Sequence, residues 1–380
     1  MPPIWHLVTG EYPPACGGVG DYTAALAGAL ADAGDAVHVW TPAAQASSTA
    51  RGVTVHVLPD AFGSASTAAM TAAWTDAPGV VLLQYVAHAL GARGANLPFC
   101  RWFSRQRRHV ADLRVMVHEP YFYFTPSRPW APGNALAIVQ RLMARQVVGA
   151  ASRVYFSTDT WSRYLRFAVR PVTLPIPSSI PAAASADAVA RARRAASNGD
   201  GAAPLVGHFG TYGAHVGGEL TALLPALVER LPEVRIALVG DGGAAFVDRL
   251  RAAHPRVAAR IWASGRLEAT AVAATLGACD LLLQPYPDGI TTRRTSVMAG
   301  LRNGVAVVTT RGALTEQVWD ATGAVAMAGA GDVRAQVELA AALLGDARAR
   351  AALGARGAAV YTERFSMEHT IAVLRDPAAA

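Results

Sequence analysis

The chain of 380 residues contains no lysine, and all 34 of its basic residues are arginine. Without lysine it cannot have a Walker A phosphate loop, a Schiff base or a catalytic ammonium group. A coding bias toward G and C would produce the same composition, so this absence excludes some chemistry without indicating a function.

Cysteine is also scarce, and long apolar runs are missing. Cys16, Cys100 and Cys279 are an odd, widely spaced set without metal-ligand spacing, which predicts free thiols in a reducing compartment. No apolar run reaches the ~18 residues needed to span a bilayer. The N-terminus enters a predicted strand at once, without the pattern of a signal peptide. We therefore expect a cytoplasmic protein.

The residues that are present suit two folded domains. With 52% hydrophobic and 16% charged residues, the chain can bury two cores. Its net charge of +7 favours anionic partners such as phosphates or an acidic membrane face. Nucleic acid is not expected, because the arginines are scattered and no zinc-finger or RNP-type signature occurs.

Apolar strand-like runs alternate with helix-period segments throughout the chain, which predicts parallel sheets with helical crossovers. The expected strands are Ile4–Thr9, Ala36–Trp40, Val53–Leu58, Val80–Tyr85, Leu113–His118, Arg153–Ser157, Leu205–Phe209, Val234–Val239, Arg260–Ala263, Leu281–Gln284 and Val305–Thr309. The expected α/β fold is two Rossmann-like domains that face each other across a cleft. We expect domains at 1–175 and 204–346, a linker at 176–203 and C-terminal helices at 347–380 that cross back to the first domain.

The stretch Gln284 to Ser296, QPYPDGITTRRTS, joins a predicted buried strand to a predicted helix. An acid and a glycine at such a strand exit describe a ligand site at the carboxyl edge of a sheet. The helix N-terminus and the two arginines would suit a phosphate. The alternative is an ordinary strand–loop–helix connection with a solvated arginine pair.

Two more turns of the second domain are rich in glycine: GHFGTYG, from Gly207 to Gly213, and LVGDGG, from Leu238 to Gly243. Three flexible, polar strand exits on one sheet edge suggest an extended ligand lying along that edge. A nucleoside diphosphate has a suitable length.

The first domain offers two candidate segments. GEYPPACGGVGDY, from Gly10 to Tyr22, is a glycine-rich turn before a helix. It lacks G-x-G-x-x-G spacing, and the second strand lacks the ribose-binding acid, so a nicotinamide oxidoreductase is only a second alternative. His118 and Glu119 end the fifth strand, where a histidine can bond to a substrate hydroxyl or a developing charge. Nothing in the spacing of His, Asp or Glu suggests a metal.

Together these motifs resemble the GT-B glycosyltransferases of retaining family four (glycosyl transferases group 1). The segments that carry the resemblance are GEYPPACGGVGDY, QYVAHALGARGANLPFC, VMVHEP and YPDGITTRRTSVMAGLRNGVAVVTT. They lie between residues 10 and 310, so the resemblance extends over nearly the whole chain. The resemblance implies that the second domain binds a nucleotide diphosphate sugar and the first supplies most of the acceptor site. It also implies transfer with retention, without a bound metal or any cofactor besides the donor.

Site residues follow from the resemblance position by position. His118 and Asp288 would be catalytic. The donor-binding residues would be Gly18, Gly210, Thr211, Tyr212, Gly240, Arg266, Gly289, Ile290, Thr291, Thr292, Arg293, Arg294 and Ser296. The acceptor-binding residues would be Gly17, Asp21, Tyr85 and Glu119.

The chain departs from the family pattern at several of these positions. Asp288 and Ser296 stand where the family has the two acids of its Glu-x7-Glu motif, and Thr211 and about Val216 stand where it has an arginine and a lysine. We infer that Arg293 and Arg294 replace the lost positive charge. The departures leave open a non-catalytic or divergent sugar-nucleotide-binding relative.

The segment Pro98 to Arg114 interleaves five arginines with Phe99, Trp102 and Phe103. As a basic, aromatic amphipathic helix it would suit contact with anionic lipid. The alternative is a solvated outer face of a domain helix, and the acceptor itself has no signature in the sequence.

Overall fold

The computed structural model describes residues 3–376 except 16, 44–46, 128–129, 169 and 184. The chain divides into two compact units. Unit 1 comprises Met1–Pro175 and Met367–Ala380, and unit 2 comprises Ile176–Ser366. Residues 176–203, expected as a linker, are therefore counted within unit 2, where the helix they contain packs on a helix of that unit.

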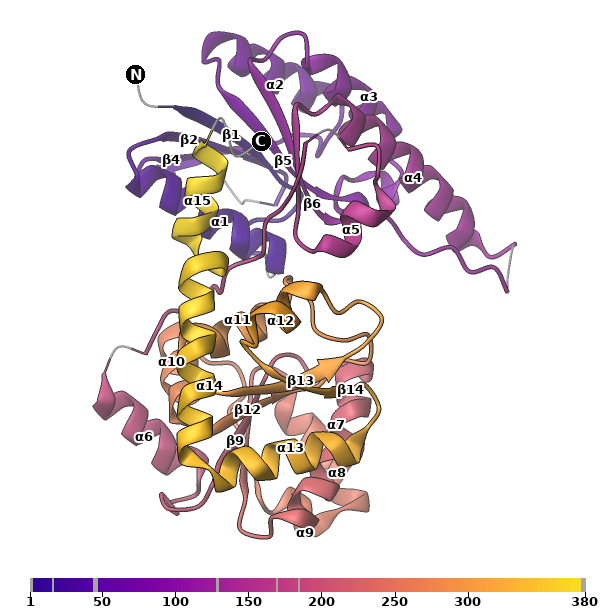
Figure 1. Ribbon diagram of the computed structural model, residues 1–380. Helices are drawn as coiled ribbons and strands as arrows, with labels where there is room; N and C mark the ends of the chain where they lie inside the picture. Colours follow the sequence, from indigo (N-terminus) through magenta and orange to yellow (C-terminus); the bar gives the residue numbers. More distant parts are fainter. Residues whose placement is uncertain are drawn as a thin grey trace. The chain divides into compact units, whose positions relative to one another are not determined.

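Unit 1 is built on a largely parallel sheet (Figure 1). Its elements are β1 (Ile4–Val8), α1 (Gly18–Asp32), β2 (Ala36–Thr41), β3 (Ser48–Ala50), β4 (Val53–Val57), α2 (Ser64–Asp76), β5 (Val80–Val86), two 3-10 turns (Ala87–Ala89 and Ala92–Gly94), α3 (Leu97–Gln106), β6 (Asp112–Glu119), α4 (Pro132–Ala150), β7 (Arg153–Phe156), α5 (Asp159–Tyr164), β8 (Pro171–Thr173) and α15 (Met367–Arg375). The strand order is β3-β4-β2-β1-β5-β6-β7-β8. The direction of winding reverses between β1 and β5, which is where such sheets bind ligands.

Helices cover both faces of the unit 1 sheet. Its central strands are largely apolar on both sides, as parallel strands between two helix layers must be. Alternate residues such as Leu83 and Val115 pack against α2, α3 and α4 in the main core. On the α1 face, α15 packs on α1, and Arg375 pairs with Asp35 at the end of that helix. Arg114, buried in β6, donates to the backbone carbonyl of Leu374.

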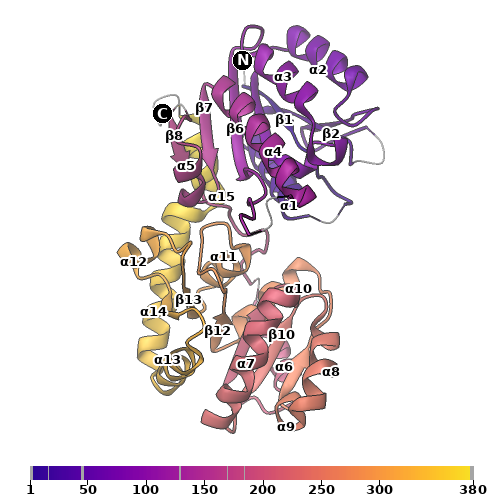
Figure 2. The same ribbon diagram turned by 90° about the vertical axis from the view of Figure 1, so that its right-hand side faces the viewer.

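Unit 2 holds a six-stranded, wholly parallel sheet (Figure 2). Its elements are α6 (Ala186–Ala196), β9 (Leu205–Phe209), α7 (Ala214–Arg230), β10 (Arg235–Val239), α8 (Gly243–Ala253), α9 (Pro255–Ala258), β11 (Ile261–Ala263), α10 (Ala269–Ala278), β12 (Leu281–Gln284), α11 (Thr295–Arg302), β13 (Val307–Arg311), α12 (Gln317–Thr322), β14 (Ala326–Gly329), α13 (Val333–Gly345), α14 (Ala347–Val360) and a π-helical turn (Tyr361–Phe365). The strand order is β11-β10-β9-β12-β13-β14, with the reversal between β9 and β12.

The unit 2 sheet also lies between two helix layers, because its strands alternate their apolar side chains between the faces. Val206 and Leu281 pack toward α7 and α13. Leu205 and Leu282 belong to the core formed with α10, α11 and the π-helical turn. Both units therefore have the Rossmann-like α/β architecture that the alternating pattern predicts.

Three short strands were not expected. β3 pairs antiparallel with β4 as an edge hairpin, whereas β8 and β14 are outermost parallel strands. Each has only three or four residues, too few for periodicity to mark them. The first helix begins at Gly18, inside the glycine-rich segment Gly10 to Tyr22 that was expected to precede it.

The basic, aromatic helix is α3, and its aromatic side faces inward. Phe99 and Phe103 are fully buried in the unit 1 core, and the partly buried Trp102 donates to the Thr71 hydroxyl. These rings are therefore not available to a lipid surface. Within the described part of the chain, no helix is both long and apolar enough to cross a bilayer.

The described cysteines, Cys100 and Cys279, are free and buried. Burial raises the pKa of both thiols to about 12, so they are inert. Cys16 lies outside the described residues.

Candidate functional site

The main candidate site lies in unit 2, at the carboxyl ends of four neighbouring strands. β10, β9, β12 and β13 are adjacent and parallel, so the turns that follow them share one edge of the sheet. α7, α8 and α11 begin directly after three of these turns, and none of them has a side-chain cap. Their first N–H groups are thus left for other acceptors, including anions.

The β9 and β10 turns approach each other through glycines. A Cβ on Gly240 would lie 2.3 Å from the carbonyl oxygen of Gly210, and both residues have positive φ (119° and 157°). Only glycine fits such a contact in that conformation. Thr211 is exposed, whereas Tyr212 is buried and its hydroxyl donates to the carbonyls of His208 and Val239.

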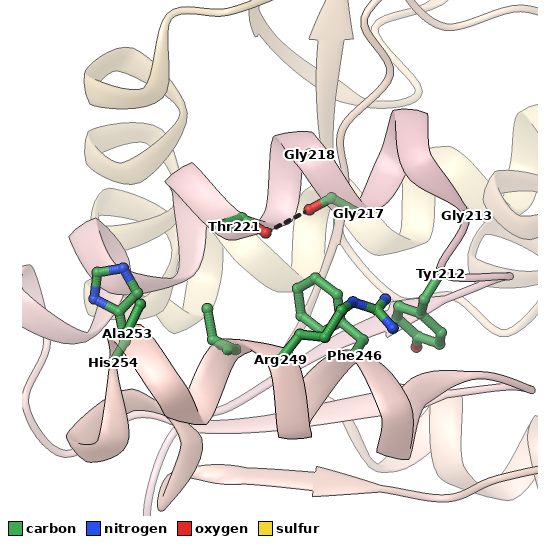
Figure 3. Close-up of a pocket in the computed structure, with 10 residues that line it drawn as sticks. Tyr212, Gly213, Gly217, Gly218, Thr221, Phe246, Arg249, Ala253 and His254 are labelled. Carbon is green, nitrogen blue, oxygen red and sulfur yellow. Dashed lines mark hydrogen bonds between the residues drawn. The ribbon is translucent and has the colours of Figure 1, made fainter.

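A cavity of about 460 Å³ opens beside Tyr212, between α7 and α8 (Figure 3). The rings of Tyr212 and Phe246 line it, with the Arg249 guanidinium 6.0 Å from the Phe246 ring centre. Gly217 and Gly218 lie on the α7 side. Tyr212, one of the expected donor-binding residues, lines this cavity and also belongs to the turn after β9.

The β12 exit holds a compact polar cluster. Arg294 Nη2 donates to Asp288 Oδ1 at 2.6 Å, and its guanidinium lies 4.3 Å from the centre of the Tyr286 ring. The Tyr286 hydroxyl is 2.7 Å from Ser296 Oγ and near Gln284. The sequence predicted Asp288, Arg294 and Ser296 as neighbours but not the ion pair between the first two.

The β13 exit holds the β12 exit in place. The buried carboxylate of Glu316 accepts from the backbone N–H of Thr292 and, at 2.8 Å, from its hydroxyl. Gly289 has φ of +90°, and a Cβ there would lie 2.4 Å from the N atom of Gly312. The two turns therefore pack backbone to backbone, and Glu316 fixes the conformation of the residues before α11.

The remaining donor-side candidates differ in position. Ile290 and Thr291 are buried, and the Ile290 N–H bonds to the carbonyl of Thr310. Arg293 is partly buried beside the start of α11. Arg266 follows β11 at the outer strand of the sheet and is exposed, away from the β12 exit.

A second polar cluster lies in unit 1 around His118. Burial of this side chain lowers its pKa to about 3, so the ring is neutral at physiological pH. Nε2 donates to Gln84 Oε1 at 2.7 Å, which leaves Nδ1 as the acceptor. The Tyr22 ring lies edge-on, 5.3 Å away between centres. The Tyr22 hydroxyl and Gln84 Nε2 are buried without a hydrogen-bond partner in the structure, so the cluster has unused polar capacity.

The glycine-rich turn adjoins this cluster through α1. Gly17 is the N-cap and Gly18 the first residue of α1, which has no side-chain cap. Asp21 is exposed in the first turn, and Tyr22 follows it. The turn is thus another uncapped helix start at a strand exit.

Tyr85 and Glu119 do not join the His118 cluster. Tyr85 is fully buried in the core against α3, with its pKa raised well above the usual value by burial. Glu119 is partly exposed, with a carboxylate oxygen 3.9 Å from His88 Nδ1. Gln84 joins the His118 cluster and Tyr85 does not, because neighbouring residues of β5 point to opposite faces of the sheet.

Sequence reasoning missed Gln84, Tyr22, Tyr286 and Glu316. A usable signal existed for two of them: Gln84 is a polar residue in an otherwise apolar strand, and Glu316 follows a strand exit of the same sheet. No group of three or more His, Cys, Asp or Glu side chains among the described residues could hold a metal ion.

No protein-family model matches the sequence, and no curated protein does. Solved structures do match. Sucrose-phosphate synthase from Thermosynechococcus elongatus has a TM-score of 0.71 at 18% identity, over 98% of this chain and 97% of that chain. Anabaena HepE in complex with UDP and glucose has a TM-score of 0.68 at 15% identity, over 98% of both chains. WaaG, a glycosyltransferase involved in lipopolysaccharide biosynthesis, has a TM-score of 0.62 at 15% identity, over 98% and 100%.

The likeness over nearly the full length of each chain shows that this protein has the GT-B fold. The fold class expected from the sequence is thereby confirmed.

Proposed function

We propose that the protein is a glycosyltransferase that moves a sugar from a nucleotide diphosphate sugar to an acceptor hydroxyl. One observation carries the proposal. The polar cluster of Tyr286, Asp288, Arg294 and Ser296 lies at the reversal point of a parallel sheet, beside glycine turns and uncapped helix starts. In a chain with the GT-B fold, this is where a sugar nucleotide has both anion-binding N–H groups and hydroxyl-binding side chains.

The roles within unit 2 follow from charge. Arg294 and the first turn of α11 would hold the leaving diphosphate, and Asp288 would accept hydrogen bonds from sugar hydroxyls. We propose that arginines and helix N-termini meet the charge of the leaving group, without a metal ion. Activity should then survive exhaustive EDTA treatment. Complete loss that magnesium or manganese restores would contradict this part of the proposal.

His118 would serve the same reaction from unit 1. As a neutral ring with Nδ1 as acceptor, it can accept a hydrogen bond from a donor-sugar hydroxyl. In the reaction, the bond between the anomeric carbon and the diphosphate breaks and a bond to the acceptor oxygen forms on the same face of the sugar, while the proton of the acceptor hydroxyl passes to the leaving diphosphate. Electron-rich neighbours stabilise the oxocarbenium-like charge at that stage.

The direct test begins with UDP and UDP-glucose, because HepE was solved with UDP and glucose. A ligand that binds only the folded chain raises its melting temperature. We expect a nucleoside diphosphate and the corresponding sugar nucleotide to raise the melting temperature. We also expect the purified chain to hydrolyse that sugar nucleotide slowly. The configuration of the released sugar, read by NMR before it mutarotates, tests retention. If no nucleoside diphosphate or sugar nucleotide shifts the melting temperature, the proposal is wrong.

A second candidate is a binding protein without transfer activity. The Arg294–Asp288 ion pair favours it, because each charge already lies beside an opposite charge, and Thr211 and Ser296 add no charge. Binding of the sugar nucleotide with no hydrolysis or transfer would select this candidate. Binding of NADH in place of sugar nucleotides would instead select an oxidoreductase.

A further inference from the structure

Large apolar side chains are exposed on one side of unit 1. All eight strongly exposed large hydrophobic residues of the described chain belong to this unit. Six lie on α4 and on the loop before it. We call these six the α4 surface: Phe122, Tyr123, Phe124, Trp130, Ile138 and Leu142. Single exposed apolar residues are ordinary, but a contiguous group marks an interaction site.

The outer stripe of α4 is not that of an ordinary surface helix. From Ala135 onward its exposed positions are Ala135, Ile138, Leu142, Arg145 and Gly149, one stripe at helical spacing. A helix facing water normally carries charged residues on this side, yet α4 contains no acid and Ile138 and Leu142 are about half exposed (51% and 49%).

The loop before α4 is held firmly while its rings project. Gln140 Oε1 accepts from the N–H of Phe122 at 2.8 Å, and Asn134 bonds to both backbone groups of Thr125. Arg141 lies 4.2 Å from the centre of the Tyr121 ring. Figure 1 shows the loop reaching beyond the first turn of α4. The backbone held at Phe122 and Thr125 presents Tyr123 to the surroundings, and Trp130 is also exposed (59% and 95%).

Uncompensated positive charge lies beside these side chains. A cavity of about 820 Å³ between α3 and α4 is lined by Arg107, Arg108, Arg145 and Leu142. None of the three arginine side chains has a hydrogen bond or ion pair with a described residue. The sequence has no acid between Asp76 and Asp112 or between Glu119 and Asp159. The cavity therefore attracts an anion that the chain itself does not supply.

We propose that the α4 surface binds an anionic lipid bilayer. The aromatic rings, Ile138 and Leu142 enter the interfacial layer, and the cavity of Arg107, Arg108 and Arg145 holds a headgroup phosphate. Tyrosine and tryptophan favour the boundary between water and hydrocarbon, and an apolar contact joined to a basic patch gives stable peripheral binding. A nucleic acid backbone would leave the apolar side chains without a counterpart.

Vesicle co-sedimentation of the full chain tests the proposal. We expect binding to vesicles of phosphatidylcholine with phosphatidylglycerol in equal parts, and none to phosphatidylcholine alone. Arg107→Ser with Arg108→Ser and Arg145→Ser should weaken binding by about tenfold or more, and Ile138→Ser with Leu142→Ser should do the same. The matched control is Arg256→Ser with Arg334→Ser and Arg348→Ser, which removes the same charge from exposed positions of unit 2 and should leave binding unchanged.

Tryptophan fluorescence gives a second readout. Trp130 is the one strongly exposed tryptophan of the eight, and each of the others is buried or partly buried. Brominated phosphatidylglycerol should quench the wild-type fluorescence, and Trp130→Phe should remove most of that quenching. Equal binding to neutral vesicles, or equal loss in the control triple variant, would overturn the proposal. So would binding of transfer RNA, without vesicles, that depends on the same three arginines.

Discussion

The Asp288–Arg294 pair determines how the proposed donor site responds to charge. While the two groups are bonded at 2.6 Å, the guanidinium is partly neutralised before any diphosphate arrives. Asp288→Asn should therefore strengthen binding of the free nucleoside diphosphate. It should weaken binding of the sugar nucleotide, because the sugar hydroxyls lose a carboxylate partner. Arg294→Ala should weaken the diphosphate by ~1.5–3 kcal/mol and affect the free nucleoside much less. Isothermal titration with the nucleoside, the nucleoside diphosphate and the sugar nucleotide measures the three affinities.

The neighbouring Arg311–Asp320 pair provides the control. It lies on the surface at the end of β13, so Arg311→Ala removes a similar ion pair without touching the cluster. Nucleotide affinity should not change. If Arg311→Ala and Arg294→Ala weaken nucleotide binding equally, the effect of Arg294→Ala comes only from the lost net charge.

His118 gives the second prediction at this scale. His118→Ala should leave nucleotide affinity close to that of the wild type and reduce sugar transfer by ~10²-fold or more, the usual scale for losing one positioned polar group. Turnover and titration on the same preparations separate the two quantities. His109→Ala, which alters an exposed ring after α3, is the control. A fully active His118→Ala enzyme would leave His118 a structural strand end.

The sequence predicted the position of a residue where a strand ends. It did not predict which of two neighbouring strand residues faces a given side of the sheet. The sequence located His118 and Asp288, because each ends or follows an apolar run. It selected Tyr85 over Gln84, although only the alternation of β5 decides which one faces α1. The Asp288–Arg294 pair was missed because a loop conformation, fixed by Gly289 and Glu316, brings the two groups together.

Among the elements, the two strand exits joined by Glu316 behave as one structural piece. Glu316→Ala would remove two hydrogen bonds that Thr292 donates to a buried carboxylate, one from its N–H and one from its hydroxyl, at ~1–3 kcal/mol for each bond. We expect lower unfolding stability of unit 2 together with weaker binding of the sugar nucleotide, because the turn before α11 loses its support. Urea unfolding and titration report the two effects.

The comparison variant is Asp332→Ala, which removes the N-terminal cap of α13. It should reduce stability by ~0.5–2 kcal/mol and leave nucleotide affinity unchanged. If both variants alter affinity in proportion to stability, Glu316 contributes only to folding.

Most elements followed the sequence pattern closely, whereas three short strands did not. All eleven expected strands are present within a residue or two, and most of them are apolar runs buried on both faces. β3, β8 and β14 are peripheral, and position at the sheet edge rather than local pattern makes them strands.

For the whole molecule, buried neutral histidines predict acid sensitivity. Burial lowers the pKa to about 4 for His6, which stacks with His38 beside His56, and to about 3 for His118 and His208. Unfolded histidine has a pKa of about 6.5. Between these values the unfolded chain binds protons that the folded chain does not. Stability should therefore be complete above pH 6.5 and fall as the pH drops toward 4, by up to about 1.4 kcal/mol per pH unit for each such group.

Melting temperatures from pH 8 to 4 measure this dependence. His208→Leu removes one group from unit 2 and should flatten the decline, and His254→Leu, at a partly exposed ring, should not. A melting temperature that stays constant from pH 6.5 to 4.5 would contradict the prediction.

The docking of α15 on unit 1 has a consequence for how the chain is made. Asp35, Arg114 and Arg153 are buried in unit 1, and Arg375, the carbonyl of Leu374 and that of Asp376 are among their partners. On a ribosome, residues 176–366 can complete their fold as soon as they emerge, while unit 1 waits for the last segment of the chain. The half that is synthesised first should thus mature last. A nascent chain stalled before α15 should expose its first 175 residues to proteases and chaperones.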